Sequence, residues 1–229
     1  MKQRILGVIG GLGPETGCTF CLNVNRKFKL FTKRQPHIVL DNLPISQKAE
    51  ERLIKGGPSQ EHLDLLLESV HRLNRLDVDF IVIPCNTVHI FIDELREKSR
   101  APILSIVEET TKKCREMKRT KVGILGSTKT IQSGLHATEL KKGGIESITP
   151  SEVDQRFVSE CILRIINNKI REDDKEKMRT IIEKLENRGA EGILLGCTEL
   201  PRLISNQDAH IPIINTIQIL EDASIVQLI

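Results

Sequence analysis

The stretch that decides the fold is Gly192-Ile193-Leu194-Leu195-Gly196-Cys197-Thr198-Glu199, together with its counterpart Ile81-Val82-Ile83-Pro84-Cys85-Asn86-Thr87 in the first half of the chain. Each is a short apolar run that ends in a cysteine followed at once by polar residues. A run of this kind, bounded by small or polar residues, is typical of a buried parallel strand. We therefore expect both cysteines at the carboxyl ends of strands, where ligands bind in open α/β sheets.

Further landmarks repeat at matching distances. Gly7 and Cys85 lie 78 residues apart, and Gly123 and Cys197 lie 74 residues apart, each glycine standing inside an apolar run. Internal repetition combined with alternating strand and helix patterns predicts an α/β fold of two similar αβα domains, each with a mostly parallel sheet. If the two copies pack face to face, both cysteines open into one active-site cleft between the domains.

Apolar periodicity places the elements of the first repeat. It predicts a strand at residues 4–9, a helix from about Pro14 to Lys29, a strand at 37–40, a loop around 44–48 and a helix at 61–76.

Composition excludes several classes of protein. Of the 229 residues, 39% are hydrophobic and 28% charged, and no apolar run approaches the length of a membrane span. The net charge of +3 comes from 34 basic and 31 acidic residues that are scattered, so we expect no nucleic-acid partner. The first residues do not resemble a signal peptide, and six cysteines in such a chain indicate free thiols; both point to the cytoplasm.

A pair of cysteines facing each other across a ligand can remove a proton from one face of a carbon and return one to the other. Thiolate is the active base, and the pKa of a thiol falls at a helix N-terminus. Hydroxyl, amide and backbone N–H groups at the neighbouring turns suit a carboxylate; they are Asn86, Thr87, Ser127, Thr128, Thr130, Thr198 and the Gly10-Gly11 turn. No lysine motif for pyridoxal phosphate and no second pair of zinc ligands is present in the sequence, so we expect no cofactor and no metal.

Simpler interpretations stay open. A buried cysteine is often only a small hydrophobic residue, and Ser127 or Thr128 could serve only as a helix cap. His89 could assist the Cys85 thiol or pack inside a helix. Cys18 and Cys21 form a Cys-x-x-Cys pair, but it falls inside the predicted helix, which favours packing over redox chemistry.

Three ordered motifs, at residues 10–16, 84–89 and 196–199, resemble the aspartate/glutamate racemase family and its aspartate racemase branch, from Ile5 to the C-terminus. The resemblance implies two αβα domains, which we place at residues 1–105 with 216–229 and at 106–215. It also implies cofactor-independent racemisation by a cysteine pair, matched by Cys85 and Cys197, and a homodimer. The positions that hold the α-amino acid end in similar enzymes are matched by Leu12, Asn86, Thr87, Ser127, Thr128, Thr130 and Thr198.

The chain departs from the family at the substrate's distal carboxylate. Where aspartate racemases carry an arginine, the loop here reads Gln47-Lys48, so Lys48 stands in for it, and where they carry a helical lysine this chain has Asn167, with Lys169 nearby. The resemblance therefore predicts that Gln47, Lys48 and Asn167 bind the substrate's distal carboxylate. Glu199 also replaces the histidine of the glutamate branch. The resemblance predicts a small acidic amino acid as substrate, aspartate first and glutamate next. The alternatives are an isomerase of the maleate isomerase or hydantoin racemase type, and a thiol oxidoreductase that uses Cys18 and Cys21.

Overall fold

The computed structural model describes residues 3–13, 15–57 and 60–229. The first half runs through β1 (Ile5–Gly10), α1 (Thr16–Thr32), β2 (His37–Asn42), α2 (Gln47–Ile54), α3 (Gln60–Arg75), β3 (Phe80–Val82), the 3₁₀ helix η1 (Thr87–Phe91), α4 (Ile92–Lys98) and β4 (Ile103–Leu104). Helix α5 (Ile106–Glu116) leads into the second half.

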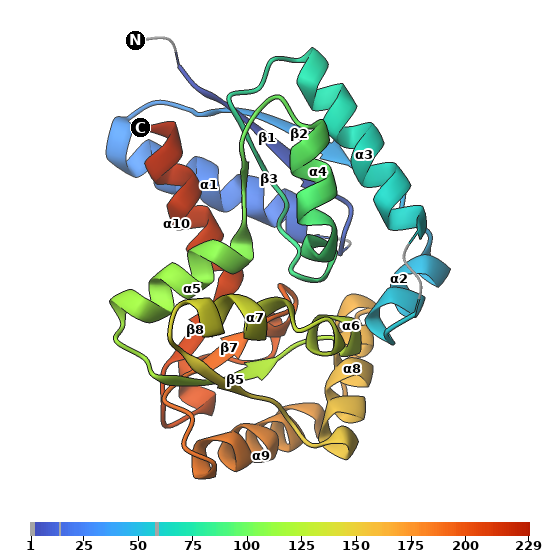
Figure 1. Cartoon of the computed structure of the whole chain (residues 1–229), viewed down its shortest axis with the longest axis vertical. Coiled ribbons are helices and arrows are strands. Elements are labelled where there is room, and N and C mark those ends of the chain that lie inside the picture. The colour runs from blue at the N-terminus through green and yellow to red at the C-terminus, as the bar shows by residue number, and fades with distance from the viewer. Residues whose placement is uncertain (1–2, 14, 58–59) are drawn as a thin grey trace.

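The second half repeats this order. It contains β5 (Lys121–Leu125), α6 (Thr128–Gln132), α7 (Leu135–Lys142), β6 (Glu146–Ile148), α8 (Glu152–Ile166), α9 (Asp174–Asn187), β7 (Ile193–Leu195), the 3₁₀ helices η2 (Leu200–Arg202) and η3 (Asn206–Asp208), β8 (Ile213–Asn215) and α10 (Thr216–Leu228). Figure 1 shows the two halves stacked along the long axis of the molecule.

Each half is built on a parallel four-stranded sheet. The strand orders are β2-β1-β3-β4 and β6-β5-β7-β8, so the two halves have the same sheet topology. In the first sheet Gly7 pairs with Ile81, and in the second Gly123 pairs with Ile193. The predicted fold class, two similar α/β domains with parallel sheets, is confirmed.

The repeated glycines are packing positions. A Cβ atom at Gly7 would lie 3.1 Å from the Leu73 side chain, and one at Gly123 would lie 3.0 Å from Ile193 and 3.1 Å from Leu185. Contacts this short are tighter than ordinary van der Waals contact, so a side chain at either position would displace its neighbours by a few tenths of an ångström. The two glycines thus let α3 and α9 approach their sheets closely, which explains why they recur at equivalent positions.

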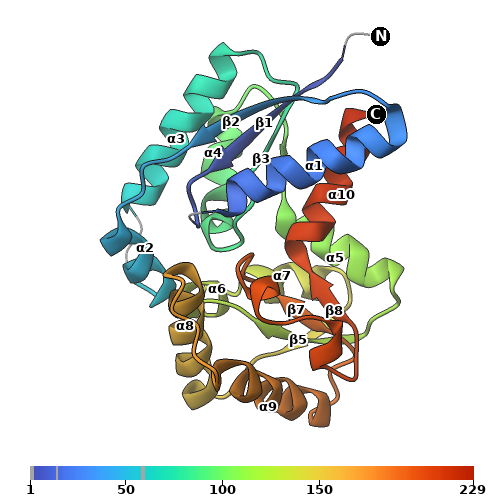
Figure 2. The ribbon, with the colours of Figure 1, turned by 180° about the vertical axis from the view of Figure 1, so that it is seen from behind.

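Helices α5 and α10 connect the halves. The start of α5 packs on the first sheet through Ile106, whereas Cys114 near its end belongs to the core of the second half. Leu220 of α10 joins the first core. Figure 2 shows α10 lying beside α1, and Figure 1 shows the end of α10 in the same half of the molecule as β1.

Two sequence-based boundaries need correction. Helix α1 begins at Thr16, and Pro14, where we predicted its start, lies outside the described residues. The predicted loop around residues 44–48 is shorter than expected, because Ser46 caps α2 by accepting a hydrogen bond from the Ala49 N–H at 3.2 Å. Gln47 and Lys48 therefore lie in the first turn of a helix.

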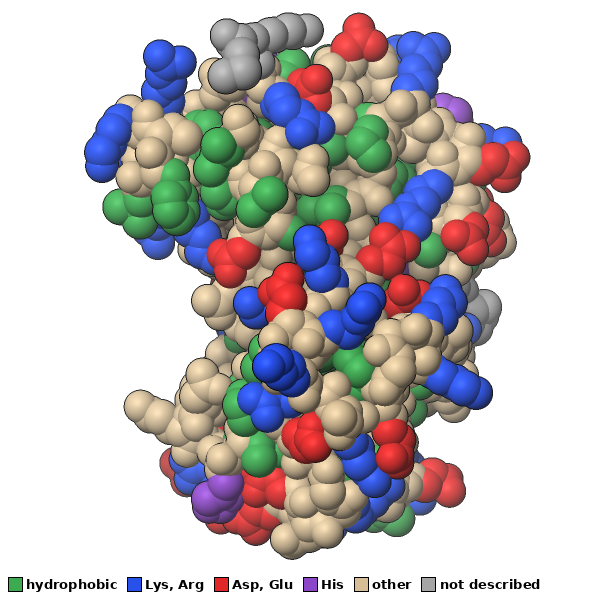
Figure 3. All heavy atoms as spheres, turned by 60° about the vertical axis from the view of Figure 1, so that its left-hand side comes forward, with side chains coloured by type: hydrophobic (Ala, Val, Ile, Leu, Met, Phe, Trp, Pro, Cys, Tyr) green, Lys and Arg blue, Asp and Glu red, His purple; other side chains and the backbone are tan. Residues whose placement is uncertain are grey.

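The surface carries both charges. Figure 3 shows blue and red side chains interspersed over one face, with hydrophobic side chains gathered on the half that contains α1 and α10. Among the described residues, no helix has the length and apolar character needed to cross a membrane.

Candidate active site

Cys85 stands just past the end of strand β3, where the chain turns into η1. Its thiol is half-buried, and the backbone N–H groups of Thr87 and Val88 act to lower its pKa. These donors stabilise negative charge on the sulfur.

Cys197 has the same surroundings in the second half. It follows strand β7 and Gly196, it is half-buried, and the backbone N–H groups of Glu199 and Leu200 act to lower the pKa of its thiol. The repeat thus produces two equivalent thiol sites, each at the carboxyl end of the third strand of its sheet.

The two thiols line one small cavity of about 40 Å³ between the halves. Its remaining walls combine amide and hydroxyl groups, aliphatic side chains and three titratable groups: Asn86, Thr87, Ser127, Thr198, Leu12, Leu53, Ile54, Val88, Ile166, Glu50, His62 and Glu199. The predicted substrate residues Leu12, Asn86, Thr87, Ser127 and Thr198 are all among them.

Both thiols are protonated at neutral pH. Burial raises the pKa of the Cys85 thiol to about 11, more than the backbone N–H groups lower it, and the Glu50 and Glu199 carboxylates raise it further. Burial likewise raises the pKa of Cys197, as do Glu199 and Cys85. Our expectation that these pKa values fall at a helix N-terminus is therefore wrong, because loss of hydration outweighs the backbone donors.

Three hydroxyl groups meet where the halves touch. Thr87 Oγ1 lies 3.1 Å from Ser127 Oγ and 2.9 Å from Thr130 Oγ1, and the last two lie 3.0 Å apart. Ser127 also caps α6, so capping and cavity lining are combined in one residue. Thr130 belongs to this cluster but does not line the cavity. Thr128 turns away, toward Ser159 Oγ at 2.7 Å.

The Asn86 amide joins the halves at the floor of the cavity. Its Nδ2 donates to Thr216 Oγ1 at 3.0 Å, and its Oδ1 lies 2.9 Å from His136 Nε2. His89, beside it, hydrogen-bonds the Cys85 carbonyl oxygen at 2.8 Å instead of the thiol. Burial lowers the pKa of His89 to about 4, so the ring is neutral and packs as a structural residue.

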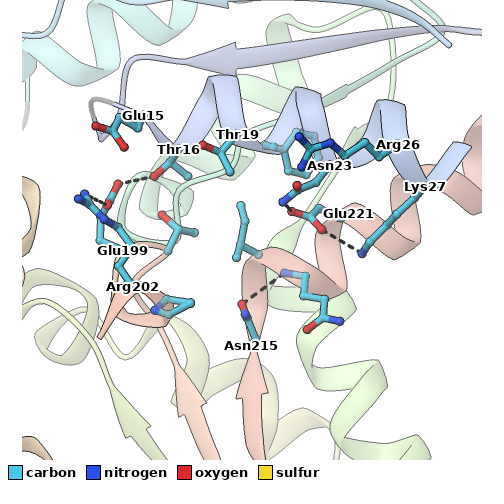
Figure 4. A pocket seen from close by; sticks show the side chains of 15 residues that line it. Glu15, Thr16, Thr19, Asn23, Arg26, Lys27, Glu199, Arg202, Asn215 and Glu221 are labelled. Atoms are coloured by element: carbon cyan, nitrogen blue, oxygen red, sulfur yellow. Dashed lines mark hydrogen bonds and ion pairs between the residues drawn. The ribbon is translucent and has the colours of Figure 1, made fainter. Parts of the chain in front are cut away.

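Glu199 separates this cavity from a larger one. Its buried carboxylate accepts a short hydrogen bond from Thr16 Oγ1 and pairs with Arg202 Nη1 at 3.2 Å. Figure 4 shows these three side chains at one end of a second cavity of about 590 Å³, whose wall includes Thr198 and Glu199. Since Thr16 starts α1 and Glu199 follows β7, this contact also joins the two halves.

The residues predicted for the distal carboxylate lie elsewhere. Lys48 is exposed, and Gln47 Nε2 makes a long hydrogen bond of 3.4 Å to Asn167 Oδ1 on the outside of the molecule, between α2 and α8. None of the three lines the cavity.

Two titratable residues of the cavity were not predicted from the sequence. Glu50 follows Lys48 by two positions, and His62 begins the buried stripe of α3 that continues with Leu66, Ser69 and Leu73. Because these residues follow one another at helical spacing, the sequence could have predicted that His62 faces inward.

The Cys18 and Cys21 pair lies in the first turns of α1, with Cys18 exposed. Burial, and then Cys18, raise the pKa of Cys21 to about 11, which makes that thiol a poor nucleophile. Among residues 3–13, 15–57 and 60–229, no three His, Cys, Asp or Glu side chains converge in a way that could hold a metal ion.

Comparison with known proteins identifies the family of the chain. Residues 9–223 match the family model described as Asp/Glu/Hydantoin racemase. The chain is 27% identical over 217 residues to the broad specificity amino-acid racemase RacX of Bacillus subtilis, covering 93% of this chain and 92% of that one.

Solved structures share the fold. A candidate Asp/Glu racemase from Yersinia pestis is 30% identical, with a TM-score of 0.86, covering 98% of this chain and 99% of that one. The Picrophilus torridus aspartate racemase shows the same fold at 24% identity, with a TM-score of 0.81, covering 98% of this chain and 93% of that one. The chain belongs to the Asp/Glu/Hydantoin racemase family.

Proposed function

We propose that this protein racemises an α-amino acid without a cofactor, with Cys85 and Cys197 as the two bases. One observation supports this above all others: the two half-buried thiols line the same cavity from opposite halves of the molecule. A ligand between them would present one face of its α-carbon to each sulfur.

The chemistry balances with these groups alone. One cysteine, as thiolate, takes the proton from Cα, and the electron pair left on carbon delocalises into the α-carboxylate. The opposite thiol then gives its proton to the other face of Cα and becomes the thiolate. Hydroxyl groups of Thr87, Ser127 and Thr198, which line the cavity, hold that carboxylate in this proposal as its charge grows.

Single substitutions separate the two bases. Cys85→Ala and Cys197→Ala should each abolish racemisation, yet each should still exchange the Cα hydrogen of one enantiomer with solvent deuterium, a different enantiomer for each variant. Cys18→Ser is the matched control and should retain full turnover, because this thiol is exposed on α1. Near-normal racemisation by either alanine variant would refute the two-base mechanism.

The rival functions give different signals. Attack of a cysteine on carbon, as in an isomerase of the maleate type, would leave a substrate-sized mass increase on Cys85 or Cys197 after trapping. A thiol oxidoreductase would lose its dithiol signal in the Cys18→Ser variant, whereas a racemase would not.

The acidic substrate, aspartate or glutamate, is the prediction from sequence. It requires a cation at the distal carboxylate, and Lys48 would have to turn inward to provide one. Chiral analysis of each standard amino acid after incubation with the protein tests the prediction directly.

We further propose a cytoplasmic homodimer. All six cysteines are free, which suits a reducing compartment. Leu22, Leu30 and Phe31 on α1, with Val226 and Ile229 at the C-terminus, are large apolar side chains that are more than half exposed. They belong to the helix pair over which Figure 3 shows hydrophobic side chains gathered. Size measurement by light scattering, repeated with Phe31→Glu, tests this interface.

A further inference from the structure

The cavity between the thiols is lined by acidic groups and by no cation. Among the described residues that line it, the charged side chains are the carboxylates of Glu50 and Glu199. Arg202 compensates Glu199 from the side of the larger cavity. Glu50 therefore decides the charge that a bound side chain meets.

Glu50 lies on α2 and is partly buried. Within the described part of the chain its carboxylate forms no hydrogen bond and no ion pair, whereas its neighbour Glu51 accepts a hydrogen bond from Gln47 at 2.9 Å. Burial, followed by the charges of Glu199 and Glu51, raises the pKa of Glu50. A carboxylate in this position is stabilised by a ligand that donates a hydrogen bond or carries positive charge.

His62 provides a second, independent observation. The ring lines the same cavity, only 2% of the residue is exposed, and its Nδ1 atom has no hydrogen-bond partner among the described residues. Buried polar atoms are almost always paired, so the unpaired Nδ1 leaves this ring, which lines the cavity, with hydrogen-bonding capacity that no described residue uses. Burial lowers the pKa of His62, so the ring is neutral and has one acceptor nitrogen available.

The position of these groups assigns them to the substrate's side chain. The turns that carry the two cysteines supply Asn86, Thr87 and Thr198 for the α-carboxylate end, whereas Glu50 and His62 come from α2 and α3. Leu53, Ile54 and Ile166 add an aliphatic part to the wall. A substrate held at Cα between the sulfurs would direct its side chain away from the cysteine turns, toward the part of the wall that α2 and α3 supply.

We propose that the racemase site prefers an amino acid whose side chain ends in a hydrogen-bond donor, a hydroxyl or an ammonium group, with Glu50 and His62 as the groups that accept it. The preference rests on the proposed racemase function and names its substrate class. Aspartate and glutamate are disfavoured, because their distal carboxylate would meet the Glu50 carboxylate without a cation between them.

The experiment compares four-carbon amino acids that differ only in their terminal group. Homoserine carries a hydroxyl, 2,4-diaminobutyrate an ammonium, aspartate a carboxylate and 2-aminobutyrate a methyl group. The value of kcat/KM for deuterium incorporation at Cα is measured for each. Homoserine or diaminobutyrate should exceed aspartate at least about tenfold, and which of the two is faster identifies the donor.

Variants assign the preference to Glu50. Glu50→Gln should reduce kcat/KM for the preferred substrate about tenfold or more and increase it for aspartate, and Glu50→Lys should reverse the order. Glu51→Gln is the matched control, since it removes the same charge one residue away, outside the cavity, and should leave the order unchanged.

The outcomes are distinguishable. If aspartate exchanges fastest in the wild-type protein, or if Glu50→Gln leaves the order of substrates unchanged, the proposed specificity is wrong while the racemase function stands. If no amino acid exchanges its Cα hydrogen, the racemase function itself is wrong and the specificity falls with it.

Discussion

Raising the pH should activate this protein steeply, and the structure gives the size of the effect. Burial and two carboxylates raise the pKa of Cys85 from 9.0 to about 11. That difference of two units corresponds to about 2.7 kcal/mol against the thiolate. At pH 8 the active thiolate is then only about one molecule in a thousand. Its share, and kcat/KM with it, should rise about tenfold per pH unit, or about a thousandfold from pH 7 to pH 10.

The second thiol shapes the same profile. Because the pKa of Cys197 is raised as well, that cysteine stays protonated and able to donate, so no falling limb is expected below pH 10. The assay is deuterium incorporation at Cα by NMR, at substrate concentrations well below KM, with circular dichroism to confirm folding at each pH. Cys18→Ser should give the same curve. A profile that levels off below pH 9 would refute the assignment of Cys85 as a desolvated base.

Two further predictions concern the contact between the halves. Burial lowers the pKa values of His89 and His136 to about 4 and about 3, below the 6.5 of an unfolded histidine. The unfolded chain therefore binds more protons than the folded protein as the pH falls from about 6.5 to 4. The free energy of unfolding should then fall by about 1.4 kcal/mol per pH unit for each histidine. Urea titrations at several pH values measure this, and a midpoint that stayed constant would contradict it. Asn86→Ala should reduce the free energy of unfolding by about 1–3 kcal/mol, because it leaves His136 and Thr216 without their hydrogen-bond partner. A urea midpoint within error of wild type would show that these hydrogen bonds do not stabilise the fold.

The arrangement of the sheets and both thiols could be predicted from sequence because each depends on a local pattern. An apolar run that ends in cysteine defines a strand and its carboxyl end, and Gly7 with Gly123 mark the equivalent packing positions of the two halves. The repeat then places the second site once the first is known. None of these inferences needs knowledge of which distant residues meet.

The part of the cavity wall that contains Glu50 could not be predicted, because it depends on the residue at which α2 begins and hence on which of its side chains face inward. Once Ser46 caps α2, Ala49 and Leu53 face the core, Lys48 turns to solvent and Glu50 reaches the cavity. Moving the helix start by one residue would exchange these roles. The direction of the thiol pKa shifts was also out of reach, since desolvation is a sum over neighbours from both halves.

The way the chain crosses between the two sheets determines how a ligand can enter. It crosses twice, at α5 and at α10, and these helices pack on each other and on the first core. Two halves that are joined through two adjacent helices can move about those helices by a hinge motion. The edge opposite these helices lies at α2 and α8. There the halves are connected by the long, weak hydrogen bond between Gln47 and Asn167. Any separation of the halves at that edge breaks the contact between Gln47 and Asn167.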